Sequence, residues 1–128
     1  MGVNVWAVLT AAASSFLLGG LWYSPVLFGP AWNRANLSRP QPGHPARVFG
    51  VSVVLAVAAA FAFAGWLGPA PELARALTLG LTAGLFFVTT SLGINYQFAQ
   101  RGPTLLAIDG GYHTAQFLLF GLVIGLWH

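Results

Sequence analysis

The sequence predicts an all-α membrane protein with four transmembrane helices, arranged as two helical hairpins packed in a compact bundle. The chain has 128 residues, of which 57% are hydrophobic and 5% are charged. Soluble domains carry about 25% charged residues because their surface faces water. Disordered chains are poor in apolar residues. A free-standing soluble domain and a disordered chain are therefore both excluded.

The positions of the charged residues predict the number of spans. The charges are Arg34, Arg39, Arg47, Glu72, Arg75, Arg101 and Asp109, and they leave charge-free windows at 1–33, 48–71, 76–100 and 110–128. A bilayer-spanning helix needs about 20 predominantly apolar residues. Four windows predict four spans in one domain, residues 1–128, with room for short loops only.

The first predicted helix covers residues 3–27. It is not a signal peptide, because such peptides begin with a basic region and the first Lys or Arg here is Arg34. Pro25 and the Gly-Pro at 29–30 are expected to end this helix, since proline cannot continue the backbone hydrogen-bond ladder. Residues 30–47 form the longest predicted loop, with Trp32 at the level of the lipid headgroups.

The other three predicted helices cover residues 48–67, 73–98 and 104–127, separated by short Gly- and Pro-containing turns. Small residues recur every fourth position in the second helix, at Ser52, Ala56, Ala60 and Ala64. In the third helix, Gly80, Gly84, Ser91 and Asn95 form a second small face. Small side chains let helix backbones approach closely in membranes, so both faces are predicted packing surfaces.

Arginine counting predicts the orientation. The first and third loops share one side of the membrane and hold four arginines, whereas the other side holds only Arg75. The positive-inside rule places the four arginines in the cytoplasm. We therefore expect a multi-pass protein of the cell (plasma) membrane with both termini outside.

A faint internal repeat relates the two predicted hairpins. Residues 20–23 and 29–30, Gly-Leu-Trp-Tyr and Gly-Pro, match 93–96 and 102–103, Gly-Ile-Asn-Tyr and Gly-Pro, at a constant offset of 73. The matched segments end helices that run in the same direction. This pattern suggests parallel hairpins related by an axis along the membrane normal. Chance is the alternative, because glycine and leucine are abundant.

The end of the first predicted helix also resembles a known family. It reads Trp22-Tyr23-Ser24-Pro25, then Leu27-Phe28-Gly29, then Trp32. This run is similar to the signature of the DUF1761 family of small, uncharacterised membrane proteins, and residues 108–112 resemble its last helix. The resemblance implies a four-helix membrane protein and no established activity.

The fourth predicted helix carries the polar residues that could form a site. Asp109, His113 and Gln116 share one helix face, flanked by Tyr112. Ionisable side chains are expensive in hydrocarbon, so they are functional candidates by default. Trp22 and Tyr23 end the first helix, and Asn95 and Tyr96 end the third, on the same side of the membrane. We therefore predict a polar pocket in the cytoplasmic half, lined by these eight residues.

Structural interpretations compete with the pocket. Asp109 could be the N-cap of a helix that starts at Gly110, or it could form a structural hydrogen bond with His113. Trp22, Tyr23 and Trp32 could be anchors at the membrane interface. A metal site has too few ligands nearby. The chain has no cysteine, phosphate loop or dinucleotide fingerprint, and no serine nucleophile with a base partner.

The predicted function is that of a lipid-embedded, homo-oligomeric structural or binding protein with a pocket around Asp109 and His113. The expected partners are membrane lipids, with no nucleic acid, cofactor or metal. The alternative is a proton-linked transporter or channel subunit for a small solute, working as an oligomer. A lipid-modifying enzyme with Asp109 and His113 as acid and base is the weakest interpretation, since no oxyanion stabiliser or metal accompanies them.

Overall fold

The computed structural model describes residues 3–36 and 43–128, and every regular element in them is helical. The helices are α1 (Val5–Trp22), α2 (Gly29–Ala35), α3 (Pro45–Leu67), α4 (Leu73–Leu81), α5 (Thr90–Phe98) and α6 (Pro103–Leu126). A π-helix, η1 (Thr82–Thr89), joins α4 to α5. The all-α prediction is confirmed. Arg39, one of the four predicted cytoplasmic arginines, lies outside the described residues.

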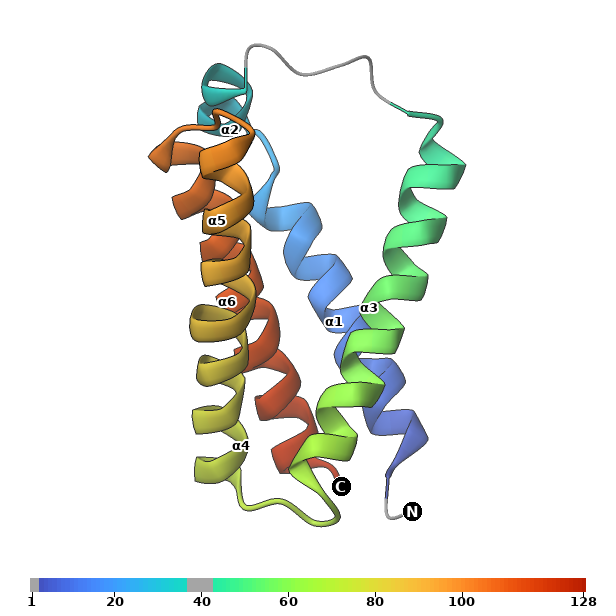
Figure 1. Ribbon diagram of the computed structural model, residues 1–128. Coiled ribbons are helices and arrows are strands. Elements are labelled where there is room, and N and C mark those ends of the chain that lie inside the picture. Colours follow the sequence, from blue (N-terminus) through green and yellow to red (C-terminus); the bar gives the residue numbers. More distant parts are fainter. Residues whose placement is uncertain (1–2, 37–42) are drawn as a thin grey trace.

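The long helices run alternately up and down, and both termini lie at the same end (Figure 1). α6 is the central helix, because it packs on α1, on α4 and on η1 and also contacts α2 and α5. The apolar core lies in the half of the molecule nearer the termini. Its large buried side chains from α3 and α6 are Phe63, Leu67, Phe120 and Ile124, and α1 contributes buried alanines.

α3 packs along only part of its length. Its buried residues are Ala56, Ala60, Phe63, Ala64 and Leu67, so three of the four predicted small residues face the core. Ser52, the fourth, is exposed and bonds to the carbonyl of its own Val48. Residues 48–55 are exposed without exception, and this half of α3 stands away from the other helices (Figure 1).

Three helical segments of the described chain are long and apolar enough to cross a membrane: Val5–Trp22, Pro45–Leu67 and the continuous helix Leu73–Phe98. α6 has 24 residues but is not one of the three, and it carries Asp109, His113 and Gln116. The structure therefore has three candidate spans where the sequence predicts four.

The chain after α1 differs from the prediction. α1 ends at Trp22 rather than Leu27, because Pro25 keeps the residue before it out of the helical region. Part of the predicted loop 30–47 is helical, as α2 begins at Gly29 with Pro30 in its first turn. Proline is favoured there because its missing N–H would have no partner anyway. Pro45 starts α3 in the same way, three residues earlier than expected.

The packing of α4 and η1 against α6 depends on glycine. A Cβ on Gly84 would lie 2.6 Å from the Cα of Thr114, and a Cβ on Gly80 would meet the carbonyl oxygen of Phe117. From α6, a Cβ on Gly121 would meet the carbonyl oxygen of Ala76. The two backbones therefore touch, and no larger residue fits without moving a helix.

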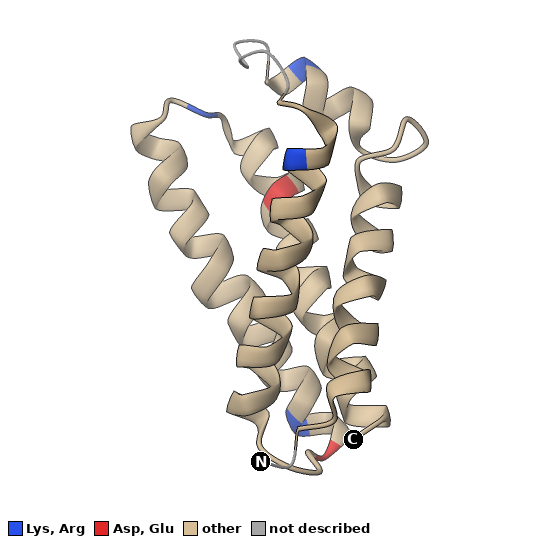
Figure 2. Cartoon of the chain, turned by 90° about the vertical axis from the view of Figure 1, so that its right-hand side faces the viewer, with Lys and Arg blue, Asp and Glu red and all other residues tan. Residues whose placement is uncertain are grey.

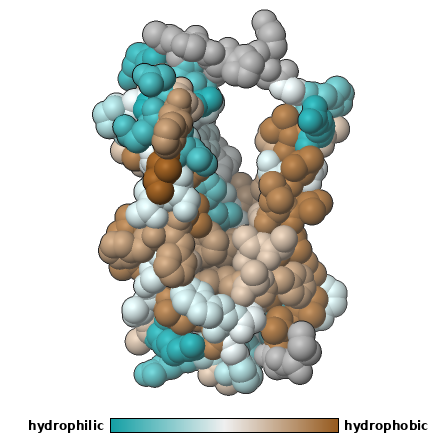
Figure 3. Space-filling view, in the orientation of Figure 1, coloured by the Kyte–Doolittle hydropathy of each residue, from teal (hydrophilic) through white to brown (hydrophobic). Residues whose placement is uncertain are grey.

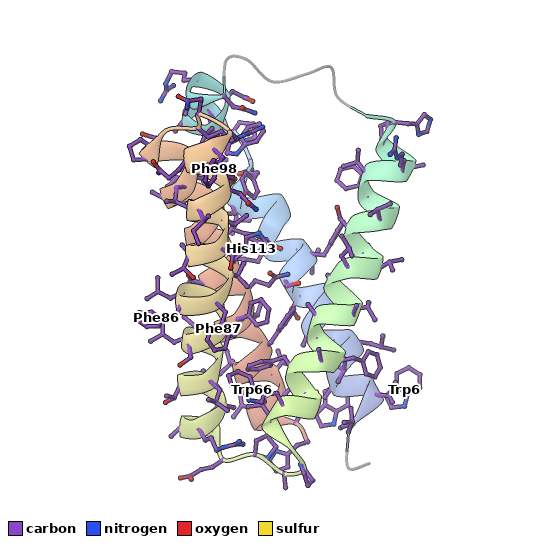
Figure 4. The ribbon with its side chains drawn as sticks, in the orientation of Figure 1. Trp6, Trp66, Phe86, Phe87, Phe98 and His113 are labelled. Atoms are coloured by element: carbon purple, nitrogen blue, oxygen red, sulfur yellow. The ribbon has the colours of Figure 1, made fainter. Side chains whose placement is uncertain are left out.

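The outer surface suits a lipid environment. The labelled side chains of Trp6 and Phe86 point away from the bundle (Figure 4) and are 70% and 60% exposed, and Phe98 is 86% exposed. The charged residues gather towards the two ends of the molecule (Figure 2). An apolar middle between two charged ends matches the profile of a bilayer.

Candidate functional site

Asp109 is the centre of a polar cluster that joins four elements. Its Oδ1 accepts hydrogen bonds from the Tyr23 hydroxyl at 2.6 Å and from the Trp32 indole N–H at 3.0 Å. Its Oδ2 accepts a hydrogen bond from the Tyr96 hydroxyl. We call these four residues the Asp109 hub. Tyr23 follows α1, Trp32 is on α2, Tyr96 is on α5 and Asp109 is on α6, so one carboxylate ties these elements together.

The local chain paths bring the donors to Asp109. After α1, the turn over residues 23–28 is closed by backbone hydrogen bonds, including Phe28 N–H to the Trp22 carbonyl at 3.0 Å. This turn folds α2 back over the end of α6 and directs Trp32 towards Asp109. The indole of Trp22 also bonds to α6, through the carbonyl of Ile108 at 2.9 Å. The aromatic residues around the turn thus bond to other parts of the protein.

Arg101 closes the outer side of the hub. Its guanidinium donates to the Asn36 side-chain oxygen at 3.2 Å and lies 5.7 Å from the centre of the Tyr96 ring. Burial and the hydrogen bond to Asp109 raise the pKa of Tyr23 above its ordinary value. Tyr23 therefore remains a proton donor to the carboxylate.

The two structural interpretations of Asp109 from the sequence are both wrong in detail. α6 begins at Pro103 with Gly102 as its N-cap, so Asp109 lies inside the helix and does not cap it. Asp109 bonds to Tyr23, Trp32 and Tyr96, whereas His113 bonds to Gln116. The polar face of α6 is therefore divided between two clusters.

The internal repeat meets at the hub. Tyr23 and Tyr96 are the matched tyrosines of the two segments, and each donates to a different oxygen of Asp109. The matched prolines, Pro30 and Pro103, each stand in the first turn of the next helix. The matched tyrosines and prolines of the two segments thus have similar structural roles.

Because the tyrosines share one acceptor, their contributions to stability should be coupled. We expect Tyr23→Phe and Tyr96→Phe each to lower the free energy of unfolding by about 1 kcal/mol. The double variant should lose at least about 0.5 kcal/mol more than the sum, since Asp109 keeps only the Trp32 donor. Denaturant titration of the purified protein measures all three values. Strictly additive losses would contradict a shared hub.

A second polar cluster lies further along α6. His113 Nδ1 is 3.0 Å from Gln116 Oε1, and the amide nitrogen of Gln116 lies 3.5 Å from the hydroxyl of Ser15 on α1. The Ser15 hydroxyl donates to the carbonyl of Ala12 at 2.9 Å. Tyr112 adds a hydrogen bond from its hydroxyl to the Ser15 carbonyl at 2.9 Å. This cluster joins α6 to the middle of α1.

His113 faces an open space. His113, Phe117 and Phe120 share one face of α6, and both phenylalanine rings pack on Phe63 of α3. His113 lies one turn closer to the hub than Phe117, at a level where α3 is farther from α6. Its side chain is half-buried (Figure 4). The space-filling view shows the α3 column separated from the other helices in its upper half and joined to them below (Figure 3). We call this gap, between residues 48–55 of α3 and the α1 and α6 side, the opening.

Two of the predicted residues lie elsewhere. Asn95 and Ser91 are exposed on the surface of α5, and Ser91 bonds to the carbonyl of its own Phe87. The reason is the π-helix η1, whose wider turn shifts the face that follows it. The face towards α6 runs from Gly80 and Gly84 to Thr89, which bonds to the Gly110 carbonyl at 3.0 Å, and then to Tyr96.

Sequence reasoning missed two groups in these clusters. Trp32 was assigned to the headgroups, yet its spacing after Tyr23 and the Gly-Pro helix start of α2 could have indicated a return towards the same end of the bundle. Ser15 was included only among the serines that lack a base partner, although it is a polar residue among the alanines of α1. A hydroxyl in such a face commonly bonds across to a neighbouring helix.

A groove of about 540 Å³ lies on another face of α6. Small and apolar residues dominate its lining, with Ala107, Gly111 and Ala115 from α6 and Leu85 from η1. Neither Asp109 nor His113 lines it. Within residues 3–36 and 43–128, no three His, Cys, Asp or Glu side chains lie close enough to hold a metal ion.

Comparison with known proteins identifies a family. The sequence model of the family described as "Protein of unknown function (DUF1761)" matches residues 6–125, nearly the whole chain. No curated protein and no solved structure matches the chain.

Proposed function

The chain belongs to the DUF1761 family, and from this premise we propose that it crosses the bilayer four times and binds an amphiphile in a blind polar pocket. In this proposal, the Asp109 hub holds the helices together at the cytoplasmic end. The pocket is the opening beside α3, with His113 and Gln116 as its polar residues. The protein acts by binding and carries out no reaction.

The proposal rests on the fact that the polar face of α6 is divided between the Asp109 hub and the His113–Gln116 cluster. All three donors around Asp109 come from the chain itself, which supports a structural role. His113 instead faces the opening, with Nδ1 as its one hydrogen-bonded ring nitrogen among the described residues. A polar atom at that depth in a membrane needs a partner, which a ligand or water can supply.

The fourth span in this proposal is α6. Its 24 residues give about 36 Å at 1.5 Å per residue, enough for a hydrocarbon core of about 30 Å. Its polar residues face α1, α2 and α5 or the opening, so the helix does not expose them to lipid. Four spans also agree with both termini lying at one end.

The proposed orientation keeps Arg34, Arg47 and Arg101 in the cytoplasm and both termini outside. Single cysteines can test it, because the chain has none of its own. A membrane-impermeant thiol reagent added to intact cells should label Glu72→Cys, in the turn before α4, and should spare Ala35→Cys at the end of α2. The reverse labelling would overturn the orientation.

A homo-oligomer is also part of the proposal. The groove beside Ala107, Gly111 and Ala115 supports it, because small residues allow a helix of a second copy to approach closely. Oxidative cross-linking of Ala107→Cys, which is exposed, is the direct test. A variant that stays monomeric in liposomes would exclude this groove as the contact.

The alternative, proton-linked transport, predicts ion flux, and we expect none. Below His113 and Gln116 the interior consists of Phe63, Phe117 and Phe120, whose rings pack on each other. This apolar floor interrupts any polar path through one copy. Liposomes with a pH gradient and a trapped dye should hold the gradient equally well with the wild-type protein, with Asp109→Asn and with no protein. Flux that Asp109→Asn abolishes would establish transport instead.

A further inference from the structure

We propose that the ligand of the opening is an uncharged lipid with a free hydroxyl group, such as a diacylglycerol or a long-chain alcohol, whose hydroxyl donates to Nε2 of His113. This inference rests on the proposed binding function and names its ligand class. Three features support it: the direction of the hydrogen bonds behind His113, the depth of His113 and the exposed half of α3.

The hydrogen bonds behind His113 run in one direction. The Ser15 hydroxyl donates to the Ala12 carbonyl, so its oxygen is left to accept from the Gln116 amide nitrogen at 3.5 Å. The Gln116 carbonyl oxygen then faces His113 Nδ1 at 3.0 Å and can only accept. In this proposal the imidazole carries its proton on Nδ1, towards Gln116, which leaves Nε2 as an acceptor. The group that completes the site must therefore be a hydrogen-bond donor.

The depth of His113 selects an uncharged donor. His113 lies ten residues from Pro103 at the start of α6, which corresponds to about 15 Å along the helix. That is about half of a 30 Å hydrocarbon core. A phosphate or an ammonium group would lose most of its hydration at this depth, whereas a hydroxyl that gains one hydrogen bond loses little. Charged headgroups would instead stay near the arginines at the end of the molecule.

The exposed half of α3 provides the apolar side of the site. Eight consecutive residues, 48–55, are exposed, so this part of the helix lies mostly outside the packed bundle. They extend for about 12 Å, close to the thickness of one leaflet. Apart from Gly50 and Ser52, the side chains of these residues are aliphatic or aromatic, and Phe49 reaches across to Phe16 of α1 with ring centres 6.0 Å apart. An acyl chain fits between these surfaces, with its polar end at His113.

Photo-cross-linking tests the ligand class. The wild-type protein is placed in phosphatidylcholine nanodiscs with a diacylglycerol that carries a diazirine on one acyl chain, or with the same lipid acetylated on its hydroxyl. Mass spectrometry then locates the label. We expect labelling on residues 48–55 and around His113, with about fivefold more label from the free hydroxyl, as one hydrogen bond of about 1 kcal/mol gives. In His113→Phe the ratio should fall to about one.

The control variant is His128→Phe, which removes an exposed histidine at the opposite end of the molecule and should leave the ratio unchanged. Equal labelling of the opening by both lipids, unaffected by His113→Phe, would overturn the hydroxyl inference but keep the proposed pocket. Displacement of the probe by an anionic phospholipid would also overturn it. Labelling confined to the outer surface would overturn the pocket itself.

Discussion

Replacing Asp109 by leucine is expected to lower the free energy of unfolding by about 3 kcal/mol. The change removes the acceptor of three hydrogen bonds and leaves the donors of Tyr23, Trp32 and Tyr96 without it. Each unsatisfied donor costs about 1–3 kcal/mol when buried. The three donors are only half-buried, so each should cost close to the lower value of about 1 kcal/mol, which gives about 3 kcal/mol in total. Reversible unfolding in mixed micelles, followed by tryptophan fluorescence, measures the loss.

Two further variants show whether the loss comes from the hydrogen bonds. Asp109→Asn keeps the shape and one acceptor oxygen, so we expect it to lose about 1 kcal/mol. Glu72→Gln changes the other acidic residue of the chain, which is exposed before α4, and should stay within about 0.5 kcal/mol of the wild type. If Asp109→Leu were as stable as Glu72→Gln, the hub would not hold the fold together.

The second large effect is expected from a single methyl group on η1. In Gly84→Ala, the new Cβ would lie 2.6 Å from the Cα of Thr114 and 2.8 Å from the carbonyl oxygen of His113. Both contacts are with backbone, which cannot rotate away as a side chain can. We therefore expect η1 and α6 to move apart, with a loss of about 2 kcal/mol in the free energy of unfolding.

Gly65→Ala is the matched control for this variant. Gly65 is also helical, and nothing lies within 4 Å of the position that its Cβ would take. Alanine is the better helix former by about 1 kcal/mol, so this variant should be unchanged or slightly more stable. Equal effects of the two substitutions would show that glycine acts on helix propensity and not on the contact between η1 and α6.

The sequence predicts the positions of the helices better than it predicts which face of each helix packs against its neighbours. Helix positions follow from charges and prolines, which are expensive inside a bilayer or a helix, so residues 73–98 were predicted as one helix and are one. The face of that helix was predicted correctly only up to Gly84. The π-helical turn rotates the following residues, and a regular 3.6-residue period therefore assigns Ser91 and Asn95 to a side that Thr89 and Tyr96 occupy.

The sequence predicts which polar residues lie at the same membrane depth, but not which of them form hydrogen bonds with each other. Grouping polar residues at one membrane side brought Tyr23, Tyr96 and Asp109 together correctly. The choice between Asp109 and His113 as bonding partners depends on side-chain directions that helical spacing cannot give. Trp32 was missed because a proline-rich segment resembles a loop, and α2 becomes evident only when Pro30 is placed at a helix start.

The hub also sets an order of events during biosynthesis. All three donors to Asp109 precede it in the chain, so α1, α2 and α5 leave the ribosome before α6. An isolated aspartate costs up to about 3 kcal/mol on insertion, the value at the centre of a membrane helix, and Asp109 lies in the first half of α6. By the time Asp109 reaches the membrane, Tyr23, Trp32 and Tyr96 have already been synthesised and can receive it. α6, the long helix that is not apolar enough to be a candidate span, thus enters after helices that can assist its insertion.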